Sequence, residues 1–320
     1  MREQESGRVE RANRVAWSVI ALVLAADLVW LSFASLSVAP LSLAGPLAAA
    51  AALAAAAWYY RTKRAETKLA DALDCTGQMT AFMAGGALLS YLMATLGLPL
   101  QDAAFQAADR ALGLDWLAYL KAVDARPWLG TLFSLAYASF IPQVLILILG
   151  LCFTGRGDAA RIMVLAMILS GAVTIVISGF LPAMAMFVHL GLGPADYPNL
   201  SPGASFVHVA DMQALRAGAP FTLDIGRAEG IITFPSYHAA LGLIMLLAAC
   251  AHPWLRWPFV LLNLAMIAAT PIDGGHYFVD VLAGLAIAWA AHLAAGRIVA
   301  VKAAARPEIG FAASQVLAKP

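Results

Sequence analysis

The sequence predicts an all-α protein, a polytopic transmembrane bundle of about eight helices. Of its 320 residues, 62% are hydrophobic and only 12% are charged, and the mean hydropathy is +0.79. Soluble domains contain roughly 45–50% apolar and about 25% charged residues, so an aqueous fold could not bury this much apolar surface. The apolar residues also gather into segments of about 20 residues, the length at which a helix crosses a bilayer. Membrane-spanning strands are shorter and alternate, so these segments predict helices.

Eight spans are expected in chain order. Their approximate ranges are 15–38, 41–60, 75–98, 128–153, 162–187, 231–251, 258–272 and 277–300. The first is longer than a signal-peptide core and lacks a cleavage pattern, so we expect it to be retained. The first two spans carry few polar groups and precede the basic run 61–68. We therefore predict an accessory helix pair with its basic loop (1–74), a six-helix core (75–304) and a cytoplasmic tail (305–320).

Basic residues in the short loops predict the orientation, because loops rich in Lys and Arg stay in the cytoplasm. They precede the first span and follow the second, fourth, sixth and eighth spans, which puts all of them on one side. These residues are Arg2, Arg8, Arg11, Arg14, Arg61, Lys63, Arg64, Lys68, Arg156, Arg161, Arg256, Lys302, Arg306 and Lys319. We expect the plasma membrane, which in bacteria is the inner membrane, with both termini cytoplasmic and with 99–127, 188–230 and 273–276 outside.

Two of the outer segments are long enough to have structure of their own. Segment 101–123 mixes apolar residues with acids and amides, which predicts either an amphipathic stretch on the membrane interface or a helical connector that covers the core. Segment 191–230 contains four prolines and enough apolar residues to pack down, which favours a lid.

The overall charge and the cysteines exclude several classes of function. A net charge of +1 gives no reason to expect a nucleic-acid partner. Cys75, Cys152 and Cys250 lie in or beside apolar spans without CxxC spacing, so we interpret them as small hydrophobic residues rather than a disulfide or metal site.

Two histidines lie at predicted outer span ends, about forty residues apart in sequence. His238 closes the run Phe-Pro-Ser-Tyr-His, in which the proline suits a helix start and Ser236 offers a hydroxyl near unpaired backbone N–H groups. His276 lies in Gly-Gly-His-Tyr-Phe-Val-Asp, and Asp280 is four residues further on, hence on the same helix face. Asp280 could therefore orient one ring nitrogen of His276 and leave the other free.

This combination of residues suits phosphoryl transfer. An oriented histidine is a nucleophile, and a second histidine can exchange protons with the leaving or attacking oxygen. Gly274 and Gly275 leave room for a phosphate beside the backbone, and a helix N-terminus favours the anion. The chemistry requires no metal or other cofactor.

The two runs resemble the second and third motifs of the type 2 phosphatidic acid phosphatase superfamily. The sequence of residues 274–280 is most similar to that of the branch that contains inositol phosphorylceramide synthases. The resemblance implies that His276 is a phosphohistidine nucleophile, Asp280 orients it, His238 protonates the leaving oxygen and Ser236 contacts phosphate. It also implies a lipid phosphate, diphosphate or phosphodiester as substrate.

The sequence departs from that family pattern where the family has cations. Ala269 and Thr270 occupy the positions of a Ser-Arg pair in the third motif, and 179–183 lacks the Lys and Arg-Pro of the first motif. We therefore expect Arg216 or Arg227, in the outer segment, to supply the missing positive charge.

Two alternative functions remain open from the sequence. Polar residues within spans, namely Asp27, Gln78 and Gln143, would suit a transporter or an inactive scaffold. His and carboxylate side chains can also bind zinc. The residues available for that are His238, His276, Asp273 and Asp280.

Overall fold

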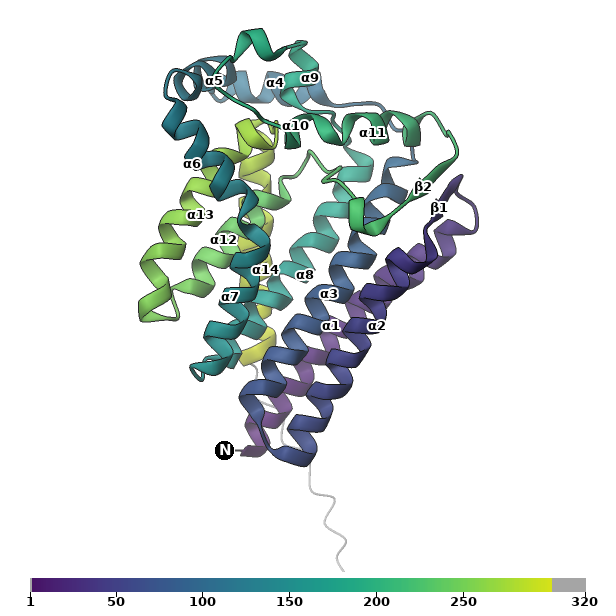
Figure 1. Cartoon of the computed structure of the whole chain (residues 1–320), viewed down its shortest axis with the longest axis vertical. Helices are drawn as coiled ribbons and strands as arrows, with labels where there is room; N and C mark the ends of the chain where they lie inside the picture. Colours follow the sequence, from purple (N-terminus) through teal and green to yellow (C-terminus); the bar gives the residue numbers. More distant parts are fainter. Residues whose placement is uncertain (1, 301–320) are drawn as a thin grey trace, which may run out of the picture.

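The computed structural model describes residues 2–300, which are mostly helical and contain only two short strands (Figure 1). Eight helical units form the bundle: α1 (Arg2–Leu31), α2 (Pro40–Tyr59), α3 (Thr67–Ala94), α6 (Pro127–Ala138) with α7 (Phe140–Phe153), α8 (Gly157–Phe180), α12 (Tyr237–Ala249), α13 (Pro253–Asp273) and α14 (Phe278–Ala300). The predicted all-α bundle is confirmed. Lys302, Arg306, Lys319 and the predicted tail 305–320 lie outside the described residues.

Most of these helices are individually suited to cross a bilayer. Within residues 2–300, five helices are long and apolar enough to cross a membrane: α1, α2, α8, α13 and α14. Helices α6 and α7 meet the same criterion together, as one span bent by 55°. The bend has a covalent cause, because Pro142 has no N–H to donate to the carbonyl of Ala138, four residues earlier. The chain is an integral membrane protein.

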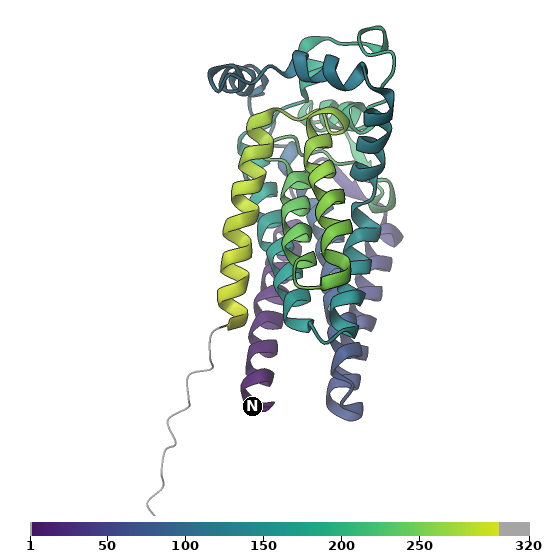
Figure 2. The ribbon, with the colours of Figure 1, turned by 90° about the vertical axis from the view of Figure 1, so that its left-hand side faces the viewer.

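The bundle has two different ends (Figures 1 and 2). One end, which we call the basic end, carries the start of α1, the π-helical turn η1 (Tyr60–Arg64) and the connections α7–α8 and α12–α13. The opposite end is covered by short helices that we call the cap: α4 (Asp102–Ala111), α5 (Trp116–Asp124), α9 (Met186–Leu190), η2 (Pro194–Asp196), α10 (Ala204–Val207), α11 (Val209–Arg216) and η3 (Ile225–Arg227). Residue 2 and the last described turn of α14 both lie toward the basic end (Figure 2). The basic loops therefore share one end, as their spacing predicts.

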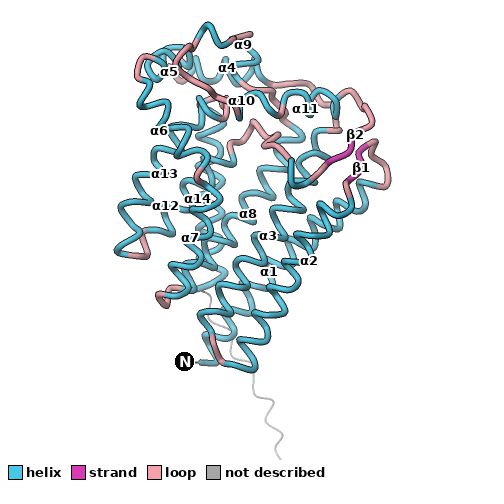
Figure 3. The backbone as a smooth tube through the Cα atoms, in the orientation of Figure 1, coloured by secondary structure: helices cyan, strands magenta, loops and turns pink. Residues whose placement is uncertain are grey.

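The first two helices are joined to the rest of the protein at both ends. At the cap end, β1 (Leu36–Val38), between α1 and α2, pairs in parallel with β2 (Phe221–Leu223) of the predicted lid (Figure 3). At the basic end, Arg61 bonds to Asp71 and Asp74 of α3 at 3.0 and 2.6 Å, and Arg161 of α8 pairs with Asp71. Each of these four largely buried charges has an oppositely charged partner, so the network connects α3 with η1 and α8.

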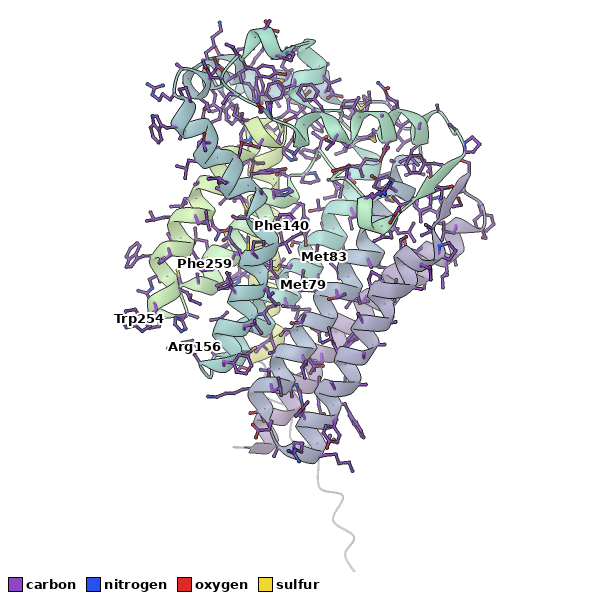
Figure 4. All side chains as sticks on the ribbon, in the orientation of Figure 1. Met79, Met83, Phe140, Arg156, Trp254 and Phe259 are labelled. Carbon is purple, nitrogen blue, oxygen red and sulfur yellow. The ribbon has the colours of Figure 1, made fainter. Side chains whose placement is uncertain are left out.

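Large apolar side chains also point away from the protein, as lipid contact requires. Trp254, at the start of α13, projects from the tip of the α12–α13 hairpin and is 84% exposed (Figure 4). Trp257, one turn along, is also exposed. Two tryptophans at one end of a hairpin are typical of the membrane–water interface.

Candidate active site

The two histidine motifs lie side by side because α14 packs closely against the start of α12. A Cβ atom added at Gly284 would lie 2.1 Å from the carbonyl oxygen of Ser236, so only glycine permits this approach. The amide of Ser236 also donates a hydrogen bond of 3.0 Å to the carbonyl of Asp280. A glycine and one backbone hydrogen bond thus join residues that are 44 to 48 positions apart in the sequence.

His276 and Asp280 form a buried pair at the start of α14. The Nδ1 atom of His276 lies 3.3 Å from Oδ2 of Asp280, and the same oxygen accepts a hydrogen bond of 2.9 Å from the amide of Tyr277. Asp280 is fully buried and His276 is 3% exposed. The carboxylate therefore holds the ring by Nδ1, and the Nε2 edge faces Gly274.

Burial also sets the charge of His276. It lowers the pKa of His276 to about 4, because the imidazolium form loses its hydration, while a backbone hydrogen bond with Thr233 acts in the opposite direction. The ring is consequently neutral at physiological pH. A neutral imidazole keeps the lone pair that a nucleophile needs.

Tyr137 of α6 bonds to the second histidine and lies near the first. Its hydroxyl lies 3.1 Å from Nδ1 of His238, and the two rings stack with centroids 4.1 Å apart. A Cβ atom added at Gly274 would lie 2.7 Å from the Tyr137 hydroxyl and 2.6 Å from Cδ2 of His276. Tyr137 thus lies beside both histidines. Sequence reasoning missed it, since a single tyrosine in an apolar span forms no motif.

The glycines before His276 allow other side chains to pack against the loop. Gly275 has a φ of +66°, which disfavours any residue with a side chain. A Cβ at this position would also lie 2.9 Å from the hydroxyl of Ser205. That hydroxyl lies 2.9 and 3.0 Å from the carbonyls of Ile272 and Asp273 and can donate to either. The role of Gly274 and Gly275 in phosphate binding stays a prediction.

Helices α4 and α5 hold the histidine loop from the cap side. The indole N–H of Trp116 donates to the carbonyl of His276 at 3.1 Å. The hydroxyl of Tyr277 donates to Asp102 at 2.8 Å, and Asp102 also accepts from the amides of Met184 and Ala185. Burial and the neighbouring Asp102 raise the pKa of Tyr277, which keeps its hydroxyl protonated as a donor. The carboxylate of Asp102 therefore bonds to the two residues that directly follow 179–183, the stretch in which the family pattern has cations.

Asp109 caps helix α14 from a different helix. Its two oxygens accept hydrogen bonds of 2.9 and 2.8 Å from the amides of Phe278 and Val279. The first amides of a helix have no partner within the helix, and a carboxylate there also interacts favourably with the helix dipole. Segment 101–123 is thus a connector packed on the core. Asp102 and Asp109 are seven residues apart, which places both on one helix face, but nothing in the sequence indicates their target.

The other predicted phosphate ligands lie in separate places. Ser236 is fully buried and caps α12, with its hydroxyl oxygen accepting from the amide of Ala239 at 3.3 Å. The guanidinium of Arg216 donates to the carbonyl of Leu98 at 2.7 Å. The side chain of Arg227 is 88% exposed, beside Asp224. The assignment of positive charge to either arginine stays a prediction.

The described residues give no support to the zinc alternative. Across residues 2–300, no three His, Cys, Asp or Glu side chains converge in a group that could hold a metal ion. His238 instead bonds to Tyr137, and Asp273 accepts a hydrogen bond of 2.6 Å from Ser134.

Comparison with known proteins assigns the family. A family model described as the PAP2 superfamily matches residues 103–294, well over half of the chain and including both histidine motifs. The chain belongs to the PAP2 superfamily. Membership supports a phosphatase or phosphotransferase type of function. The PAP2 match begins in α4, so α1, α2 and α3 precede it. No curated protein and no solved structure matches the chain.

Replacement of Gly284 by Ala tests the contact that joins the two PAP2 motifs. We expect Gly284→Ala to lower turnover by about 100-fold, because a displacement of about 1 Å between reacting groups has effects of that size. Gly296→Ala on the same helix is the matched control, since a Cβ there meets nothing within 4 Å. Turnover would be measured on purified protein in detergent. Equal turnover of the two variants would show that the close approach is dispensable.

Proposed function

We propose that the protein catalyses metal-independent phosphoryl transfer on a lipid phosphate, diphosphate or phosphodiester, through a phosphohistidine at His276. The observation that carries the proposal is the buried pair of His276 and Asp280, with Tyr137 linking it to His238. This arrangement supplies an oriented neutral nucleophile and a second imidazole for proton transfer.

The proposed reaction has two steps. Nε2 of His276 attacks phosphorus, the bond to the leaving oxygen breaks, and His238 gives that oxygen a proton. Water or another alcohol then attacks the phosphohistidine and returns the proton to His238, while the P–N bond breaks. Asp280 stabilises the positive charge that His276 gains in the first step, as the orienting carboxylate does in other triads.

Tyr137 gives His238 a defined role in this scheme. When the Tyr137 hydroxyl donates to Nδ1, the proton of the neutral ring is on Nε2. The first step requires His238 in its doubly protonated form, whose Nε2–H is given to the leaving oxygen and whose Nδ1–H donates to the Tyr137 hydroxyl. Tyr137 can serve both states because a hydroxyl donates and accepts.

The charges near the site favour a phosphodiester over a phosphomonoester. Asp102, Asp109 and Asp280 all bond to residues 277–279, and Asp273 lies just before them. A phosphodiester carries one negative charge and a monoester up to two, so the diester meets less repulsion from these carboxylates. A phosphodiester is among the substrate classes that the resemblance to the superfamily implies.

We also propose that the cap end faces the extracytoplasmic side. The basic residues Arg11, Arg61, Arg156 and Arg256 belong to segments at the opposite end of the bundle (Figures 1 and 2). The excess of positive charge in short loops favours the cytoplasm for that end.

Trapping of the intermediate tests the mechanism. We expect rapid quenching to capture an acid-labile phosphoenzyme in the native protein and none in His276→Ala, which should lose turnover entirely. His238→Ala should still form the intermediate from a substrate with a good leaving group, because such a group needs little protonation. Chelator should leave turnover unchanged. Full activity in His276→Ala would contradict the mechanism, and so would a loss of activity with chelator that added zinc restores. If the native protein shows neither activity nor an intermediate, the result would favour a scaffold.

The low pKa of His276 predicts the pH dependence of the first step. With a nitrophenyl lipid phosphodiester as substrate, phosphoenzyme formation should rise through about pH 4 and level off above it, because only the neutral ring attacks. Stopped-flow release of nitrophenol measures this step. Circular dichroism over the same pH range controls for unfolding. A midpoint near 6.5, the value of an exposed histidine, would show that the ring is hydrated during reaction.

Cysteine labelling tests the orientation. Ala217→Cys adds an exposed thiol in the cap, and the native Cys250 is an exposed cysteine near the basic end. An impermeant maleimide should label Ala217→Cys in intact cells and Cys250 only after permeabilisation. The reverse pattern would place the histidines on the cytoplasmic side.

A further inference from the structure

A cavity of about 320 Å³ lies beside the histidine loop, between α6 and residues 199–202. Its polar lining consists of Thr131, Ser134, Asn199, Ser201 and Asp273. Ligand sites in proteins have volumes of about 300–1,000 Å³, so this cavity suits a small molecule of the size of a lipid head group.

The hydrogen-bond donors of this lining are mostly in use. The hydroxyl of Ser134 donates to Oδ1 of Asp273 at 2.6 Å, and the hydroxyl of Thr131 donates to the carbonyl of Pro127 at 3.1 Å. The side-chain amide of Asn199 donates to the backbone carbonyl of Asp124 at 3.1 Å. The free hydrogen-bonding capacity at these side chains therefore belongs mainly to oxygen acceptors.

Asp273 supplies the strongest of these acceptors. It is 6% exposed, and its second carboxylate oxygen, Oδ2, is buried without a hydrogen-bond partner in the structure. An unpaired buried acceptor is costly unless a ligand or water satisfies it. None of the residues that line the cavity is Lys or Arg. The cavity thus disfavours anions and favours ligands that donate hydrogen bonds.

The cavity shares its walls with the histidine site. Ser134 and Tyr137 are three residues apart on α6, so they lie on one helix face, and they contact Asp273 and His238 respectively. Asp273 is followed directly by Gly274, which lies against both Tyr137 and the ring of His276. A ligand in the cavity is therefore next to the loop that carries the nucleophile.

We propose that this cavity binds the alcohol that accepts the phosphoryl group, and that this alcohol is a small neutral polyol. The inference rests on the proposed phosphohistidine mechanism. In the second step a hydroxyl oxygen of the polyol attacks phosphorus, the P–N bond to His276 breaks, and the hydroxyl proton passes to His238. Other hydroxyls of the same molecule donate hydrogen bonds to Asp273 and Asn199. The enzyme is then a transferase in the presence of polyol, with water as the competing acceptor.

Binding is tested separately from chemistry by the use of His276→Ala protein, which cannot form the intermediate. Saturation-transfer NMR on the full-length protein in detergent, with glycerol and myo-inositol as probes, should detect binding of a polyol. Adding Asp273→Asn should weaken binding at least about tenfold, because a hydrogen bond to a charged acceptor is lost. Adding Ser201→Trp, at an exposed position, should fill the cavity and abolish binding. Asp196→Asn, an acid outside the cavity lining, is the matched control and should change nothing.

The partition of product tests the role of the bound polyol. With the native protein and a lipid phosphodiester, one ester bond breaks when His276 is phosphorylated and the other is retained, so mass spectrometry should detect a new phosphodiester that joins the polyol to the retained alcohol. Ser201→Trp should lower the ratio of this transfer product to the hydrolysis product, which is a phosphomonoester. Absence of polyol binding to the His276→Ala protein would refute the site even if the phosphoenzyme is found. So would polyol binding that neither Asp273→Asn nor Ser201→Trp weakens. Tighter binding of ethanolamine than of either polyol would refute it in favour of a cation site. Polyol binding without any phosphoenzyme in the native protein would instead refute the proposed function and, with it, the role as acceptor.

Discussion

The contact between Gly284 and the backbone of Ser236 is the constraint on which the candidate site depends. It lets α14 approach the start of α12 so closely that any side chain at 284 would overlap a carbonyl oxygen. The hydrogen bond from the Ser236 amide to the Asp280 carbonyl fixes the register of the two segments. Asp280 therefore takes part in the contact through its backbone and bonds to His276 through its side chain. A shift of either helix relative to the other would therefore change the distance between Asp280 and His238.

The cap has a second structural task, which is to fix the loop before α14. Consecutive residues 276–279 are each bonded to α4 or α5, through Trp116, Asp102 or Asp109. The loop is too short to form regular structure, and Gly275 makes it intrinsically permissive. Contacts from a separate helix pair thus hold the loop that carries His276 in place.

The electrostatic character of the site follows from the same arrangement. Positions that hold cations in the family pattern are here apolar or hydroxyl residues, and the nearby segment after α8 bonds to a carboxylate, Asp102. A site surrounded by acids is poorly suited to a dianion but compatible with a monoanionic diester and with a hydroxyl-bearing acceptor. The proposed substrate charge and the proposed acceptor chemistry both rest on one feature, the group of carboxylates around residues 273–280.

The sequence by itself determined the membrane bundle and the local pairing of His276 with Asp280. The membrane spans follow from runs of apolar residues, and the pairing of His276 with Asp280 follows from the spacing of four residues on a helix. Both signals depend only on residues that are close in the chain. Tertiary structure decided the rest of the site. Tyr137 lies about a hundred residues before His238, and Trp116 lies 160 residues before His276, yet each pair is in contact. Sequence patterns reveal the periodicity within one helix, whereas these contacts depend on how helices that are distant in the sequence pack together. A single residue such as Asp109 forms no pattern that would indicate its partner.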